Sequence, residues 1–328
     1  MQKNPMQLKP RNLTLILLLL MPVSLVLALK YGATPIDWTS VWLALSRQTQ
    51  GIPITIIWEL RLPRVLTAFA VGGLLSLSGA LLQVLLRNPL ADPYVLGVSG
   101  GAATGALLSM FFGISGYALS GNAFLGALIS MFLVFGLAHS HSAWTPVRLL
   151  LTGVVIAAGW GAAISFILAI APNSNLQGML FWLMGDLSNA DTPSLPVYTV
   201  AIGLLLARTL APSLNLLVRG ELVASALGEH VKKLRIIIFL LASAMTAVAV
   251  TAAGTIGFVG LVIPHLLRMA GSNDHRDLIT QSMLLGGIYL VIADTLSRTI
   301  MSPLQLPVGV LTAFIGVPLF LYLLWKNK

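Results

Sequence analysis

Few residues of this chain have side chains that could perform chemistry. The sequence has no cysteine, which excludes disulfides and thiolate metal sites. The histidines are His139, His141, His230, His265 and His275, and none of them belongs to an H-E-x-x-H zinc motif. The first two are only two positions apart, so their side chains would not lie side by side on a helix. A metalloenzyme embedded in a membrane therefore has little support and is kept only as an alternative.

One acidic residue lies clearly inside an apolar segment, and it would be the starting point for proton or sodium coupling. This residue is Asp294. A charge at membrane depth costs about 2.5–3.5 kcal/mol, so ion-coupled transporters keep such residues for use. Arg298 follows four positions later, a spacing at which the two charges can neutralise each other on a helix. We interpret Asp294 as half of a structural ion pair, and an ion-coupled secondary transporter remains the alternative function.

The segments that carry these residues are apolar and long. The chain has 328 residues, of which 57% are hydrophobic and 9% are charged, far from the composition of soluble proteins. The run from Pro63 to Leu86 lies between the polar sequences RLPR and RNPLADP. About 24 helical residues span roughly 36 Å, somewhat more than a hydrocarbon core of about 30 Å. The composition predicts an all-α integral membrane protein, with residues 1–328 forming a single transmembrane domain.

Ten apolar segments follow one another along the chain. They lie at about 13–29, 63–86, 94–112, 117–138, 146–171, 193–210, 234–254, 256–268, 278–298 and 306–325. The segment 256–268 is too short to cross a bilayer without tilt or a re-entrant neighbour, so nine or eleven spans remain open. The first segment resembles a secretory signal peptide, but it is long and no A-x-A site precedes Lys30. The residues Tyr31 to Leu60 that follow are predicted as an external loop, with an interfacial helix around Trp38 to Leu45.

Positive charge predicts the orientation of the chain. With ten spans and a cytoplasmic amino terminus, most of the 19 lysines and arginines fall on the cytoplasmic side. The net charge of +9 is then explained by cytoplasmic loops, and we expect no nucleic-acid partner. We predict that both termini are cytoplasmic. The exceptions to the charge bias are Lys30, Arg47, Arg61, Arg64 and Arg298.

Two segments carry small residues at every fourth position. One series occupies positions 97, 101 and 105, and the other occupies positions 153, 157, 161 and 165. Such series allow helices to approach closely in lipid. Packing within the chain, a pore lining and a subunit contact all remain open.

The longest cytoplasmic segment is predicted at Ala211 to Arg235. Leu222, Ala226 and Leu227 can share one face of a short helix there, and two glycines bracket it. Glutamates beside this face would be unfavourable against anionic lipid, which favours a docking site for a soluble partner over an interfacial anchor.

The polar motifs between the apolar segments form an ordered series from about Arg61 to Leu324. They read RLPR, GALLQVLLRNPLADPYVLGVSGG, ASALGE, GTIGFVGLVIPHLLR, GSNDHR, ADTLSR and LPVGVLTAFIGVPLF. This series resembles that of the FecCD-type permeases, the membrane subunits of type II ATP-binding-cassette (ABC) importers for vitamin B12, haem and ferric siderophores. The resemblance implies a BtuC-like permease fold with about ten transmembrane helices in the bacterial inner membrane.

The resemblance also implies partners and a cargo. It suggests a homodimer with one path between the subunits, two ATPase subunits, and a periplasmic binding protein that delivers a bulky metal chelate. The chain has no G-x-x-x-x-G-K-[ST] phosphate loop, so it is not expected to hydrolyse ATP. We expect it to bind no cofactor and no metal of its own, with ATP and Mg used by the partner ATPase.

Three sets of site residues follow from the resemblance. Gates of the translocation path are expected at Asn88 and Leu90, and at Pro146 and Val147, where the family often has small hydroxyl residues instead. Contacts with the ATPase are expected at Glu221, Ala224, Leu227 and Gly228. Docking of the binding protein is expected at Arg61, Arg64 and Arg298, for which snorkelling to lipid headgroups together with the Asp294 pair is the alternative.

Overall fold

The computed structural model describes residues 9–34, 36–48, 51–139, 145–188, 190 and 192–326. All regular elements within these ranges are helical, as predicted. Ten helices coincide with the ten apolar segments: α1 (Pro10–Lys30), α4 (Leu62–Leu85), α5 (Val98–Phe111), α6 (Gly116–His139), α7 (Pro146–Ile170), α9 (Ser194–Val218), α11 (Val231–Ala253), α12 (Val259–Met269), α13 (His275–Thr299) and α14 (Val308–Lys326).

Seven helices of the described chain are long and apolar enough to cross a membrane. They are α1, α6, α7, α9, α11, α13 and the continuous helix Ile52–Leu85, of which α4 is the main part. The other apolar helices are shorter, at Val98–Phe111, Val259–Met269 and Val308–Tyr322. The expectation of a short eighth segment is thus confirmed, and two further segments are also short.

Helix α4 is the centre of the bundle, and almost all of its residues are buried. It packs against α13, α11, α9 and α12. Small residues on α4 allow this close packing. A Cβ atom at Gly72 would collide with the carbonyl oxygen of Gly286 on α13, and one at Gly79 would collide with that of Gly260 on α12. The apolar segment at 63–86 is therefore the core of the molecule as well as a span.

The two series of small residues have different surroundings. Gly101 and Gly105 on α5 face backbone carbonyls of α6, which confirms packing within the chain for the first series. In the second series, a Cβ atom at Gly153 would lie only 2.5 Å from the carbonyl oxygen of Val95. Gly161, two turns further along α7, has no described atom within 4 Å of such a Cβ. The second half of this series is therefore left unpacked by the described part of the chain.

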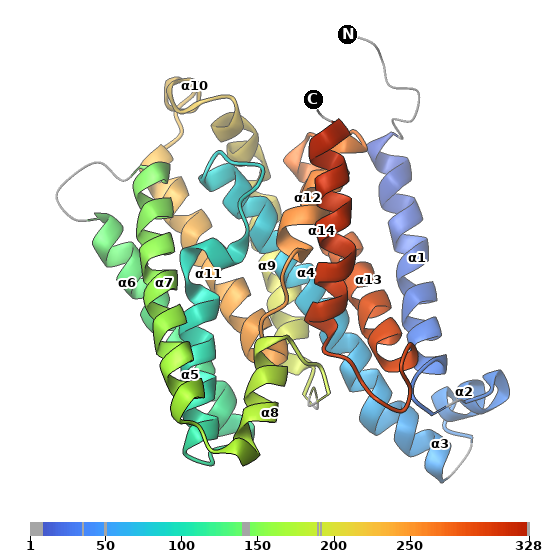
Figure 1. Cartoon of the computed structure of the whole chain (residues 1–328). Coiled ribbons are helices and arrows are strands. Elements are labelled where there is room, and N and C mark those ends of the chain that lie inside the picture. Colours follow the sequence, from blue (N-terminus) through green and yellow to red (C-terminus); the bar gives the residue numbers. More distant parts are fainter. Residues whose placement is uncertain are drawn as a thin grey trace.

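Short helices lie at both ends of the bundle (Figure 1). Helix α10 (Glu221–Ala226) lies at the end where α1 begins and α14 finishes, which we call the α10 end. Helices α2 (Trp38–Leu45), α3 (Ile52–Thr55) and α8 (Asn173–Leu183) lie at the opposite end, the α2 end. Helix α2 was predicted, whereas α8 was not. The start of α1 and the finish of α14 share one end, as the charge pattern predicts.

Two boundaries differ from those predicted. The predicted external loop up to residue 60 is shorter, because α3 and the π-helical turn η1 (Ile56–Arg61) continue directly into α4. Helix α9 continues through Pro212 to Val218, so the linker before α11 covers residues 219–230 rather than the predicted 211–235. A proline removes one hydrogen bond of a helix, but buried neighbours at Ala211 and Leu214 hold the helix together beyond it.

Candidate functional site

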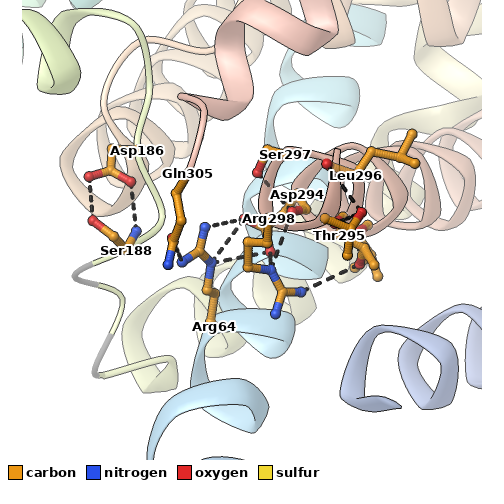
Figure 2. A network of polar contacts seen from close by, with 11 residues as sticks. Arg64, Asp186, Ser188, Asp294, Thr295, Leu296, Ser297, Arg298 and Gln305 are labelled. Carbon is orange, nitrogen blue, oxygen red and sulfur yellow. Dashed lines mark hydrogen bonds and ion pairs between the residues drawn. The ribbon is translucent and has the colours of Figure 1, made fainter. Parts of the chain in front are cut away.

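The α2 end contains a buried network of ion pairs centred on Asp294 (Figure 2). This carboxylate, on α13, has 0% exposure. Arg64, from α4, donates to its Oδ1 atom through Nε at 2.9 Å and Nη2 at 2.8 Å. Arg298 pairs with its Oδ2 atom at 3.0 Å. The predicted pair of Asp294 and Arg298 is thus confirmed, and a second cation shares the same carboxylate.

The network reaches the loop between α13 and α14. The Nη1 atom of Arg64 donates to Oε1 of Gln305 at 2.9 Å. The Nη2 atom of Arg298 donates to Oγ1 of Thr295 at 3.4 Å, as Figure 2 shows. The Asp294 carboxylate therefore connects α4 and α13 directly, and the loop through Arg64. Removing one member of such a buried network leaves a charge without its partner, which destabilises the fold.

Arg61 has a different set of partners. Its Nη1 atom donates to the carbonyl oxygens of Leu29 at 2.6 Å and Lys30 at 2.7 Å, and its Nη2 atom donates to that of Thr34. These carbonyls belong to the last turn of α1 and the residues after it. A cation at this position satisfies helix-end carbonyls and is attracted by the helix dipole. Arg61 therefore holds the end of α1 against the start of α4.

All three predicted docking arginines lie in buried positions. Arg61, Arg64 and Arg298 are each less than a tenth exposed. Arg64 and Arg298 share the Asp294 carboxylate, whereas Arg61 contacts backbone carbonyls, so this cluster carries excess positive charge beneath the surface. For Asp294, the sequence indicated the partner Arg298, which is four residues away. The other partner, Arg64 on α4, is 230 residues away, so no local sequence pattern indicates it.

At the α10 end, the predicted ATPase contact forms a short helix. Gly220 and Gly228 lie in the left-handed region with φ of 123° and 88°, which favours glycine at these two turns. Leu222 and Leu227 are 86% and 63% exposed. Ala224, which was predicted to contact the ATPase, is fully buried and holds the helix against the bundle. The exposed apolar surface of α10 therefore centres on the two leucines.

The two glutamates around α10 hold it in place. Glu221 pairs with Arg235 on α11 at 2.7 Å, and Glu229 accepts a hydrogen bond from Ser213 on α9 at 2.5 Å. The orientation of α10 is therefore tied to two spans. Glu221 remains about half exposed while it pairs with Arg235, so it borders the exposed surface that Leu222 and Leu227 form.

The predicted gate residues lie on two adjoining elements. Asn88 accepts a hydrogen bond from the backbone N–H of Leu90 at 2.9 Å, which shapes the loop after α4. Pro146 and Val147 begin α7, where Val147 is exposed. The 3₁₀ helix η2 (Pro93–Leu96), which follows the loop, packs against α7. Asn88 and Leu90 thus lie in the loop before η2, and Pro146 and Val147 lie at the start of α7, the helix that η2 contacts.

The polar contacts that fix η2 were not predicted. Asp92 accepts from the backbone N–H of Tyr94 at 2.9 Å, and the Tyr94 hydroxyl donates to the carbonyl of Ile256 at 2.9 Å. The motif NPLADPY did contain both residues. An Asp two residues before an aromatic residue at a helix start is a capping signal that could have identified this contact.

In the described part of the chain, ten apolar helices, one of them the buried central helix α4, with an exposed apolar helix at one end and a charged network at the other, are the architecture of a polytopic membrane protein. The chain belongs to the FecCD transport family, whose model matches residues 17–326. It is an ABC-type permease and not an enzyme.

Named relatives and a solved structure agree with this assignment. The hemin transport system permease HmuU of Yersinia pestis is 36% identical over 333 residues, which cover 98% of each chain. The molybdate import permease MolB of Haemophilus influenzae is 34% identical over 321 residues, which cover 97% of this chain and 95% of the relative. A solved structure of a metal-chelate type ABC transporter in an inward-facing conformation is 33% identical, has a TM-score of 0.86, and covers 97% of this chain and 100% of its own.

Proposed function

We propose that this chain is the permease subunit of an importer that moves a bulky metal chelate from the periplasm to the cytoplasm. The observation that carries the proposal is the agreement in sequence and fold with the metal-chelate type transporter over nearly the whole chain. The relatives named for hemin and molybdate differ in cargo, so cargo differs within this family. We favour a chelate over a small oxyanion because the fold relation is to a metal-chelate type transporter.

The proposed ATPase site is the outward face of α10, with Glu221, Leu227 and Gly228 of the predicted set. Leu222 and Leu227 expose large apolar surface at a helix that is fixed in place by the Glu221–Arg235 ion pair and by the hydrogen bond from Ser213 to Glu229. Exposed apolar side chains on a rigid element suit a docking surface better than a solvated one. Two ATPase subunits would use ATP and Mg, while this chain would bind no cofactor.

The proposed subunit interface is the exposed face of α7. Only 11% of the spanning window of this helix is buried, the lowest share among the candidate spans. Gly159 and Gly161 in its second half have no described atom within 4 Å of an added Cβ. Small residues of this kind allow a second helix to approach closely. A homodimer across this face would place the gate residues Asn88, Leu90, Pro146 and Val147 beside the path between the subunits.

The proposed orientation puts the α10 end in the cytoplasm, which places both termini there as well. The loop and helix-end lysines and arginines support this choice. The α2 end would then face the binding protein. Its excess positive charge near Arg61, Arg64 and Arg298 would attract acidic residues mainly through the electric field, because these side chains are buried.

The test is reconstitution with the cognate ATPase and binding protein in proteoliposomes. We expect no ATP hydrolysis by the chain alone, and hydrolysis with chelate uptake by the assembled complex. Leu227→Asp should uncouple hydrolysis from uptake or release the ATPase, because a charge would enter the proposed contact. Lys232→Asp, also exposed at the α10 end but outside α10, is the control. Uptake driven by an ion gradient without the ATPase would favour the secondary-transporter alternative.

A further inference from the structure

A groove between α1 and α13 lies outside every site described so far. It has a volume of about 300 Å³ and runs along the second half of α1 and the outer part of α13. The α1 wall includes Val23, Leu27 and Tyr31, and the α13 wall includes Ile292 and Leu296. All five side chains are more than a third exposed, so the groove opens on the outside of the bundle. Its position and chemistry favour a hydrocarbon chain over an aqueous ligand.

The two hydroxyl groups in the groove do not change this chemistry. Ser24 donates to the carbonyl oxygen of Met21 at 2.7 Å, and Thr295 donates to that of Val291 at 2.7 Å. Both protons are therefore used within their own helices, a common arrangement for these residues in spans. The walls offer no free hydroxyl proton to a ligand, and the rest of the lining is apolar.

The mouth of the groove at the α2 end is cationic and aromatic. The Lys30 ammonium lies 4.3 Å from the centre of the Trp38 ring and 5.0 Å from that of Tyr31, which itself lines the groove. Trp38 and Trp42 on α2 are exposed, as expected for aromatic residues at headgroup level. The excess positive charge of the Asp294 network lies close by, because Thr295 of the groove contacts Arg298. The mouth is thus suited to an anionic headgroup.

We propose that this groove binds one anionic phospholipid, with an acyl chain between α1 and α13 and the phosphate beside Lys30. The groove is apolar along its length and cationic at one end, which matches the two parts of such a lipid. A second copy of the chain fits less well, since the α1 wall has large aliphatic side chains where the face of α7 has small ones. The proposal rests on membrane placement and is independent of the cargo.

The test uses the full chain, purified in mild detergent and stripped of lipid. Dioleoylphosphatidylglycerol or dioleoylphosphatidylcholine is then added, and bound lipid is counted by native mass spectrometry. We expect one tightly bound phosphatidylglycerol per chain and weaker binding of phosphatidylcholine. Lys30→Gln should weaken phosphatidylglycerol binding about fivefold and remove the preference between the two lipids.

Two variants fill the groove from opposite walls. Ile292→Trp and Val23→Trp should each weaken binding about tenfold, the effect of losing burial for about two methylene groups. Leu206→Trp is the matched control, because Leu206 on α9 is 46% exposed and Ile292 is 47% exposed. If both groove variants bind lipid more weakly and the control binds as the wild type does, the loss of binding comes from filling the groove and not from misfolding.

Three results would overturn the proposal. The first is wild-type protein that binds no phosphatidylglycerol, and the second is groove variants that bind as the control does. The third is a loss of dimer mass in both groove variants, which would assign the groove to a subunit contact instead. A failure of chelate uptake in the reconstituted complex would leave lipid binding unaffected, so the two proposals can fail separately.

Discussion

Asp294 determines the charge balance of the α2 end, because it is the carboxylate that both Arg64 and Arg298 contact. The spacing of four residues to Arg298 made one of these contacts predictable. The other joins α4 to α13, and its partners are distant in sequence. A pair of this kind is set by tertiary packing, for which one sequence carries no direct signal.

The first prediction concerns the removal of this carboxylate. Asp294→Ala should destabilise the folded chain by about 3–5 kcal/mol, because two guanidinium groups would remain buried without their partner. The measurement is the thermal unfolding midpoint in detergent. Glu59→Gln, an exposed acid on η1 at the same end, should leave the midpoint almost unchanged. Equal midpoints for the two variants would contradict a structural role for the network.

The second prediction concerns Asp274, which caps the start of α13. Backbone N–H donation by Arg276 and amide donation by Asn215, both at 2.8 Å, hold the pKa of Asp274 below its usual range. A carboxylate with a lowered pKa stabilises the fold above its ordinary pKa of about 4, and this contribution is lost as the pH falls below that value. Asp274→Asn keeps an oxygen acceptor but removes the charge.

The stability difference between wild type and Asp274→Asn should therefore be present at pH 7 and shrink as the pH falls below about 4. Unfolding midpoints over this range measure it. A difference that grows on acidification would show that the charge of Asp274 is unfavourable in the fold.

At the scale of elements, close backbone approach positions the spans. The third prediction compares two glycines in helices. Gly72→Ala should destabilise the chain by about 1–3 kcal/mol, because its Cβ would collide with Gly286 and lie 2.8 Å from Cβ of Leu290. Gly136→Ala on α6 has nothing described within 4 Å and should instead be neutral or stabilising by about 0.5–1 kcal/mol. Unfolding midpoints of the two variants that shift alike would refute this packing of α4.

Helices were predicted correctly where the length of an apolar segment alone is enough to identify them. All ten apolar segments are helices, and the short segment before Arg268 is short in the structure. Helix α8 was missed because NSNLQGMLFWL carries polar residues in its first turns and lacks an apolar run of spanning length. The end of α9 was placed too early because Pro212 is a strong helix-breaking signal that tertiary contacts override.

The outcome for the site residues differs by region. The sequence predicted the bracketed helix α10, but the burial of Ala224 depends on how that helix lies on α9 and α11. The arginines at the α2 end were predicted at an exposed surface because motif position does not reveal burial. Their docking role and the gate residues stay predictions.

At the scale of the whole molecule, the exposed face of α7 predicts how two copies meet. The chain has no cysteine, so a single introduced thiol reports its own surroundings. Gly161→Cys should form an oxidant-dependent disulfide between two chains in native membranes, provided that the two Cα atoms come within about 7 Å. Gly136→Cys on the exposed part of α6 should remain monomeric on denaturing gels. Cross-linking at position 136 alone would place the interface on another face.

The partnership of α1 with α13 has a consequence for the biogenesis of the protein. Helix α1 is synthesised first, but its main neighbour is α13, which starts at His275. At roughly 5–20 residues per second, the ribosome needs on the order of 12–50 s to reach that helix after α1 has been synthesised. During this interval α1 lacks its main neighbour, and its remaining contacts include those with α2, η1 and α4, among them the hydrogen bonds from Arg61 to its last turn. Slowed translation before α13 should therefore lengthen the time during which a membrane protease can cleave α1.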